Sequence, residues 1–245
     1  MTVMTQSFVR PPIVYPDSDG EPMADNTLQY QWITKIKGNL EIAFKDDPQV
    51  FVAGDLLWYP VEGNPKIRAA PDAMVVVGRP KGDRGSYMQW LEADLAPQVV
   101  FEILSPGNRA GRMVEKSAFY LRYGVEEYYI YDPDNPEVSG FLRSNDTWSA
   151  IPDMHGWVSP RLKCRFEMND GVLQMFRPDG SLFLTEVEMA EQIEAERDRA
   201  NVERNRANVE RNRANIERDR ANAERDRANR LAERLRHLGV LDVDE

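Results

Sequence analysis

The stretch that decides the fold is APQVVFEILSPGN, residues 96–108. Its central residues, from Val99 to Leu104, are apolar with one exception, and the Ser-Pro-Gly that follows them marks a turn, so the stretch predicts a buried strand. The exception is Glu102. A carboxylate without a partner is costly to bury, and it either takes up a proton or finds a cation. The strand therefore raises the question of what Glu102 binds.

A strand–helix–strand unit is predicted around this stretch. A helical segment of roughly residues 108–123 follows the strand and ends at Gly124, a residue type favoured just after helix C-termini. The sequence EYYIYDP, residues 127–133, predicts the second strand. Two strands joined by a helix are normally parallel, so we expect part of the sheet to be parallel.

The flanking sequence extends this unit to a whole domain. Residues 27–45 predict an amphipathic helix capped at Asn26 and Thr27, with apolar residues at every fourth position. Strands are predicted in VFVAGDLLWYP and AMVVVG, and turn motifs after residue 132 indicate shorter antiparallel strands up to about residue 177. Residues 27–184 thus predict an α/β domain, a mixed sheet flanked by helices, and residues 1–26 predict an irregular N-terminal arm.

The sequence after this domain is a repeat of seven residues. The units AERDRAN, VERNRAN, VERNRAN, IERDRAN and AERDRAN run from Ala195 to Asn229. They predict a long charged helix over residues 185–238, before an acidic end at 239–245. Arg and Glu four positions apart support the helix, but a coiled coil needs an apolar residue where each unit has Asp or Asn. Three interpretations stay open: a solvated helix, a coiled coil that makes a homodimer, and an arginine surface for nucleic acid.

Composition and charge exclude several classes of protein. No apolar run approaches the roughly 20 residues that span a bilayer, and the N-terminal residues lack the pattern of a signal peptide, so we expect a cytoplasmic protein without membrane contact. With Cys164 as the single cysteine, a disulfide framework and a cysteine-built zinc site are excluded. The net charge is −10, and residues 1–194, with 18 Lys/Arg against 29 Asp/Glu, carry −11 of it, while residues 195–245 carry +1. An acidic domain disfavours unspecific adhesion to nucleic acid, but it leaves room for a local basic channel.

Three residues around the predicted sheet point to metal-dependent chemistry on phosphates. Asp72 stands at the edge of the strand that precedes Glu102, and Lys116 lies on the helix that follows it. Each has an ordinary interpretation: a Pro-Asp turn, a structural salt bridge and a solvated lysine. Together they suit Mg²⁺, which takes oxygen ligands, and an ammonium that orients water or holds a phosphate.

The same residues carry a resemblance to a known family. The sequence PDAMVVVG, followed by PQVVFEILSPGN and by a helix with EKSAFYLRYGVEEYYIYDP, resembles the bacterial restriction-endonuclease-like family of the PD-(D/E)XK nuclease superfamily, rich in cyanobacterial members. The resemblance covers about residues 27–178. It implies a restriction-endonuclease-like fold, Mg²⁺ as cofactor with Mn²⁺ as a substitute, and DNA as substrate. It also implies that Asp72 and Glu102 bind the metal and that Lys116 completes the catalytic set.

Two departures from the family pattern bear on activity. The superfamily's lysine normally follows the acid by two positions, where this chain has Leu104, and relatives often carry Asp where it has Gly111 and Arg112. A further metal ligand often comes from the first helix, which makes Glu41 a candidate. Asp55 in the FVAGD turn is a second.

Two hypotheses of function follow. The first is a Mg²⁺-dependent endonuclease that hydrolyses phosphodiester bonds of DNA through Asp72, Glu102 and Lys116. The second is a catalytically weak nuclease fold that serves as an interaction module and is multimerised by its C-terminal helix. Other chemistry is disfavoured, because His155 lies in a turn, Cys164 lies in a predicted strand, and no phosphate-binding glycine loop is present.

Overall fold

The computed structural model describes residues 13–106 and 110–238. It divides into two compact units, Met1–Glu186 and Val187–Glu245. Residues 1–12 of the predicted arm and the acidic end at 239–245 lie outside the described residues. None of the helices in the described part of the chain combines the length and the apolar character needed to cross a membrane.

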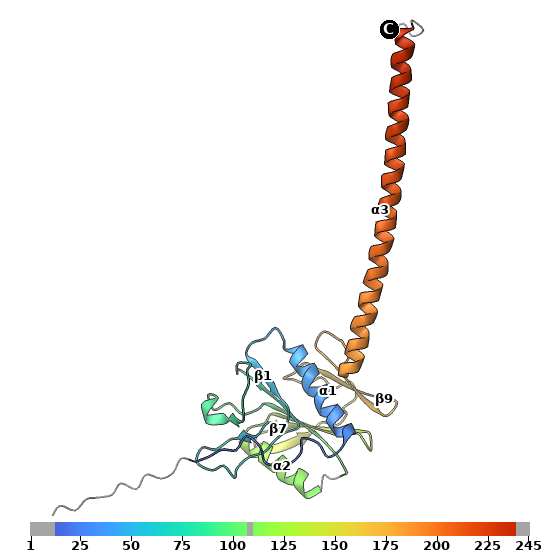
Figure 1. Cartoon of the computed structure of the whole chain (residues 1–245). Coiled ribbons are helices and arrows are strands. Elements are labelled where there is room, and N and C mark those ends of the chain that lie inside the picture. The colour runs from blue at the N-terminus through green and yellow to red at the C-terminus, as the bar shows by residue number, and fades with distance from the viewer. Residues whose placement is uncertain (1–12, 107–109, 239–245) are drawn as a thin grey trace, which may run out of the picture. The chain divides into compact units, whose positions relative to one another are not determined.

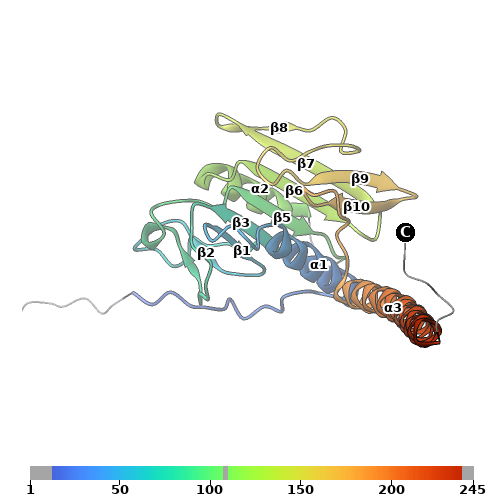
Figure 2. The ribbon, with the colours of Figure 1, turned by 90° about the horizontal axis from the view of Figure 1, so that it is seen from above.

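The first unit is built on a mixed sheet of six strands in the order β1-β3-β5-β6-β7-β8, which Figure 2 shows from above. The strands are β1 (Val50–Ala53), β3 (Ala73–Val77), β5 (Val99–Ile103), β6 (Glu127–Asp132), β7 (Glu137–Ser144) and β8 (Thr147–Ala150). As the sequence predicts, β5 and β6 are parallel, and the other neighbours are antiparallel. The predicted mixed α/β class is confirmed.

Helices cover both faces of this sheet (Figure 1). On one face α1 (Thr27–Ala43) buries Trp32, Ile33, Ile36 and Leu40 against β5 and its neighbours. Its N-terminus is capped as predicted, because the Asn26 side chain accepts a hydrogen bond from the Gln29 amide. On the other face lies α2 (Ala110–Tyr123), which the turn at Gly124, with φ +107°, connects to β6.

Two small sheets complete the unit. The antiparallel pair β9 (Arg165–Asn169) and β10 (Val172–Phe176) packs on the α1 face, and the parallel pair β2 (Trp58–Tyr59) and β4 (Tyr87–Met88) packs on the α2 face. A short 3₁₀ helix, Gln89–Leu91, follows β4.

The segment VFVAGDLLWYP does not form one strand. It breaks between β1 and β2, where Asp55 adopts a left-handed conformation with φ 48° and its amide donates to the Pro71 carbonyl at 3.1 Å. A Cβ at Gly54 would lie 3.3 Å from the Asp72 carbonyl oxygen. The small residue therefore lets the end of β1 approach the backbone at Asp72 closely.

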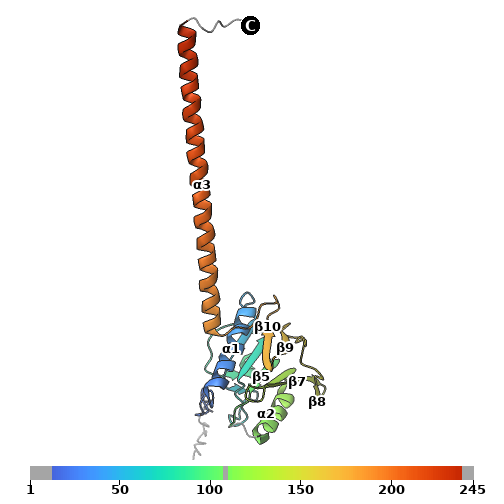
Figure 3. The ribbon, with the colours of Figure 1, turned by 90° about the vertical axis from the view of Figure 1, so that its right-hand side faces the viewer.

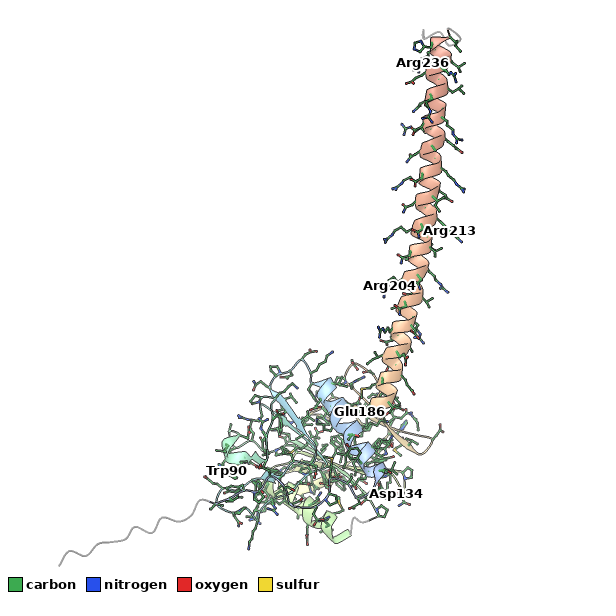
Figure 4. All side chains as sticks on the ribbon, viewed as in Figure 1. Trp90, Asp134, Glu186, Arg204, Arg213 and Arg236 are labelled. Carbon is green, nitrogen blue, oxygen red and sulfur yellow. The ribbon has the colours of Figure 1, made fainter. Side chains whose placement is uncertain are left out.

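The second unit contains α3 (Glu186–His237), a helix of 52 residues that Figure 3 shows as uninterrupted. None of its residues is buried, and the arginines labelled in Figure 4 point away from the helix axis. Val202, Val209 and Ile216, one from each central repeat, are about half exposed.

Candidate active site

Asp72, directly before β3, lies beside Glu102 of β5. Ala73 of β3 pairs with Phe101 of β5 in antiparallel register, so Asp72, one position before Ala73, lies opposite Glu102, one position after Phe101. Both residues face the side of the sheet that α2 covers, because neighbouring positions along a strand alternate between its two faces. Both are buried: the exposed fraction is 8% for Asp72 and 1% for Glu102. The Ile103 amide donates to Asp72 Oδ2 at 2.6 Å, which ties the aspartate to the strand of the glutamate.

The partners of Glu102 come from α2. Lys116 Nζ donates to both carboxylate oxygens, at 2.9 and 2.7 Å, and to the Ala70 carbonyl oxygen at 3.1 Å. The Tyr120 hydroxyl donates to Glu102 Oε1. Lys116 and Tyr120 are four residues apart on the helix and therefore share one face of it. The partners of the buried Glu102 carboxylate are thus the Lys116 ammonium and the Tyr120 hydroxyl.

Tyr120 was not predicted from the sequence. Its ring is fully buried and stacks on Trp58, with ring centroids 6.3 Å apart. Its spacing of four from Lys116 is the signal that the sequence contains. Two polar side chains on one buried helix face each need a hydrogen-bond partner on the element against which that face packs.

Asp72, Glu102 and Lys116 line a cavity of about 530 Å³. Residues of α2, of the β1–β2 turn and of the segment 19–25 form much of its lining. Acidic residues outnumber basic ones in its lining. The acidic residues are Asp19, Glu21, Asp25, Asp55, Asp72, Glu102 and Glu115, and the basic ones are Arg68, Arg112 and Lys116.

The cavity perturbs the proton affinities of its residues. Burial, and after it the charge of Glu102, raises the pKa of Asp72 to about 8. Burial and the charge of Asp19 raise the pKa of Asp55. Burial opposes the charge of Lys116, but the Glu102 and Asp72 carboxylates outweigh this effect, so the pKa of Lys116 is raised and the ammonium is maintained. Two carboxylates thus compete for one neighbouring ammonium.

Of the two additional candidate ligands, the structure brings only Asp55 to this cavity. Glu41 is about half exposed on α1 and forms an ion pair with Lys37 at 2.7 Å, so the expectation that it joins Asp72 and Glu102 does not agree with its position. The spacing of four between Lys37 and Glu41 is a surface pair that the sequence already contained.

The basic residues between β3 and β4 do not line the cavity and are engaged elsewhere. Arg79 and Arg84 both pair with Glu92 at 2.7 Å, and Lys81 Nζ donates to the Val50 carbonyl. Arg68 and Arg112 remain as cavity residues beside Lys116. Arg109 lies outside the described residues.

The residues disfavoured as nucleophile or base lie away from the cavity. Burial raises the pKa of the Cys164 thiol to about 12, so a thiolate is suppressed there. His155 Nδ1 accepts a hydrogen bond from the Met168 amide at 3.3 Å.

The donor atoms in the cavity suit a hard divalent cation. Within residues 13–106 and 110–238, no three His, Cys, Asp or Glu side chains are grouped so that they could hold a metal by themselves. Mg²⁺ does not need such a cage, because it keeps several waters and takes one or two carboxylates together with substrate phosphates. A cation beside Asp72 and Glu102 would also offset the two effects that raise the pKa of Asp72, burial first and the charge of Glu102 second. The site therefore fits Mg²⁺.

A comparison with models of protein families shows to which family the chain belongs. The family model of Uma2, described as "Putative restriction endonuclease", matches residues 19–163, more than half of the chain. The chain belongs to the Uma2 family. The Uma2 match includes Asp72, Glu102 and Lys116 as well as the cavity residues of the arm from Asp19 onward.

Two further comparisons stand beside the Uma2 match. A search of curated proteins found no match. Among solved structures, the chain is similar to a "putative nuclease belonging to DUF820" from Anabaena variabilis ATCC 29413, with 15% sequence identity and a TM-score of 0.43, covering 61% of this chain and 84% of that one.

Proposed function

We propose that this protein is a Mg²⁺-dependent endonuclease that hydrolyses phosphodiester bonds of DNA in the cytoplasm, with Mn²⁺ able to replace Mg²⁺. The observation that carries the proposal is the convergence of Asp72, Glu102 and Lys116 on one cavity. Membership of a family described as "Putative restriction endonuclease" supports the same reaction and DNA as the substrate.

Each residue has a distinct role in the proposed reaction. Asp72 and Glu102 bind the cation, and Asp55 is a further oxygen donor at the rim of the cavity. A bound Mg²⁺ supplies a water of lowered pKa and stabilises charge on the phosphate oxygens. Lys116 has all three of its N–H donors engaged, two with Glu102 and one with Ala70. Lys116 gives up one contact with Glu102 and directs that N–H to the attacking water or to a phosphate oxygen.

The test combines metal binding with cleavage. Mg²⁺ and Mn²⁺ are titrated calorimetrically into the wild type and into Asp72→Asn/Glu102→Gln, and plasmid and single-stranded DNA are incubated with the same proteins at low salt. We expect both metal binding and cleavage to be lost in the double variant. The matched control is Asp46→Asn/Asp134→Asn, which removes the same number of carboxyl groups from exposed positions outside the cavity. Absence of metal binding in the wild type would rule out the proposed reaction.

The second candidate function is an interaction module whose nuclease fold is catalytically weak. The acidic excess in the cavity favours it, because phosphates meet few cations there. In this case α3 makes the chain a homodimer through Val202, Val209 and Ile216, which recur at the coiled-coil period and are exposed in the single chain. Metal binding without cleavage of any DNA substrate would support this candidate over the first.

A further inference from the structure

The N-terminal arm forms one wall of the candidate active site. Residues 13–26 contain no helix or strand, yet six of them, from Asp19 to Asp25 with Gly20 omitted, line the cavity that holds Asp72 and Glu102. Figure 2 shows this segment running past β2 before it joins α1. An irregular segment held over a site in this way needs specific anchors.

The first anchor is aromatic. The Tyr15 ring packs against Tyr59 and Trp90, with ring centroids 5.2 and 5.0 Å apart. The Tyr15 hydroxyl accepts a hydrogen bond from the Gly63 amide at 2.5 Å, and the Tyr59 hydroxyl donates to the Pro16 carbonyl at 2.7 Å.

Two carboxylates hold the arm further along. The Asp17 carboxylate fills the space beside Gly85: a Cβ at that glycine would lie 2.5 Å from Asp17 Cγ. At the other end, Ser105 Oγ donates to Asp25 Oδ2 at 2.5 Å. The arm is therefore fixed at both ends, and its middle crosses the cavity.

The middle of the arm has the wrong charge for a surface that meets phosphates. Residues 13–26 contain Asp17, Asp19, Glu21 and Asp25 and no Lys or Arg. Asp19 lines the same cavity as Asp55, Asp72 and Glu102, so the arm meets like charge there. Its carboxylates also share the cavity with Arg68 and Arg112, the arginines a phosphate would approach.

We propose that residues 13–26 are an acidic strap that keeps nucleic acid out of the cavity and has to lift before substrate binds. This regulation rests on the proposed function, because it presumes that the cavity receives phosphodiesters. The strap is suited to lifting, because it belongs to no sheet or helix and its carboxylates line a cavity that is itself acidic.

A reversible disulfide tests the strap in the full-length chain. The short distance between Asp17 and Gly85 brings the double variant Asp17→Cys/Gly85→Cys within reach of a disulfide. The native Cys164 is fully buried and stays out of the exchange. Binding of labelled single-stranded and duplex DNA is measured by anisotropy with Ca²⁺ in place of Mg²⁺, and cleavage is measured with Mg²⁺. The two single-cysteine variants receive the same oxidant as controls.

We expect the oxidised form to bind DNA at least tenfold more weakly than the same protein after reduction, with cleavage reduced in parallel. A second variant, Tyr15→Ala, removes the aromatic anchor and should bind several-fold more tightly than the wild type. Its matched control is Tyr30→Ala, which removes an exposed tyrosine of α1 that does not line the cavity.

The outcomes separate the strap from the proposed function. Failure of the disulfide to form would show that the arm is not held beside Gly85 and would overturn the strap. Equal binding and equal cleavage by the oxidised, reduced and Tyr15→Ala forms would overturn the strap and leave the nuclease function standing. Absence of binding and cleavage in every form, including Tyr15→Ala, would overturn both.

Discussion

The ammonium of Lys116 reaches from α2 to both carboxylate oxygens of Glu102, which is almost completely buried in the middle of β5. In this structure the lysine of the site comes from the helix after the acidic strand, whereas position 104, directly after that strand, is a leucine. The ion pair thus links Glu102, the most buried carboxylate of the site, to the helix α2 that covers this face of the sheet.

Removing this ammonium should destabilise the fold. In Lys116→Met the Glu102 carboxylate loses its cation while it stays buried, and breaking a buried pair from one side costs about 3–5 kcal/mol. The control Lys37→Met breaks the exposed pair with Glu41, which is worth about 0.5 kcal/mol or less. Urea unfolding of both variants checks the prediction, and equal losses in the two variants would contradict it.

The hydroxyl of Tyr120 should contribute to stability independently of its ring. Tyr120→Phe keeps the stacking on Trp58 and removes the hydrogen bond to Glu102. Hydrogen bonds to charged groups are worth about 1.5–3 kcal/mol, so a loss of that size is expected in urea unfolding. Tyr30→Phe, at an exposed tyrosine, serves as the control and should change the unfolding free energy little.

Asp72 should make the metal-free protein less stable as pH rises. Its carboxyl keeps its proton up to about pH 8 in the folded state but loses it near pH 4 in the unfolded state. Between these values the unfolded state binds fewer protons, so the free energy of unfolding falls, by at most about 1.4 kcal/mol per pH unit. In Asp72→Asn this contribution is absent. Thermal unfolding in EDTA between pH 4 and 8 measures the difference, and parallel curves for the two proteins would contradict the assignment.

Metal affinity should depend on the same proton. A ligand carboxylate has to be ionised, so below pH 8 the affinity for Mg²⁺ is expected to weaken by up to about tenfold per pH unit. Binding at pH 6.5 should release about one proton. Calorimetric titrations in two buffers with different ionisation enthalpies measure this release, and a pH-independent affinity would mean that Asp72 is not a ligand.

Self-association of α3 should depend on one residue in each central repeat. We expect Val202→Ser/Val209→Ser/Ile216→Ser to sediment as a monomer where the wild type sediments as a dimer. The control Ala200→Ser/Ala207→Ser/Ala214→Ser changes another face of the helix. Serine and valine have similar helix propensities, whereas serine is poorer than alanine, so the control loses more intrinsic helicity. Loss of the dimer in the control alone would point to helix stability and away from a coiled-coil seam.

Much of the fold follows from local sequence. The apolar spacing and Asn26 determine where α1 begins, and the order of strand, helix and strand from Val99 to Asp132 requires a parallel pair. Glu102 stood out because it interrupts an apolar strand, and that exception leads to the site. A catalytic role for Lys116 stays a prediction from the order of acid, acid and lysine and from the family resemblance, since a lysine on a helix has no distinguishing local pattern.

What the sequence did not predict depends on contacts between distant residues. The break after β1 follows from the approach of Gly54 to the backbone of Asp72, which no local pattern encodes. The arm has no periodicity, so its position over the cavity depends on contacts such as that between Tyr15 and Trp90, 75 positions apart in numbering. Glu41 lies outside the cavity, because its spacing of four from Lys37 allows an ion pair on the surface of α1.

The equal length of the repeats in α3 has a consequence for how this helix can vary. Each unit of seven residues adds about 10.5 Å of helix and turns the following side chains by only about 20°. Whole units can therefore be gained or lost by duplication or deletion of a short DNA segment, and the pattern of charges along the helix stays nearly unchanged. The length of α3 can therefore change in steps of about 10.5 Å, one for each unit.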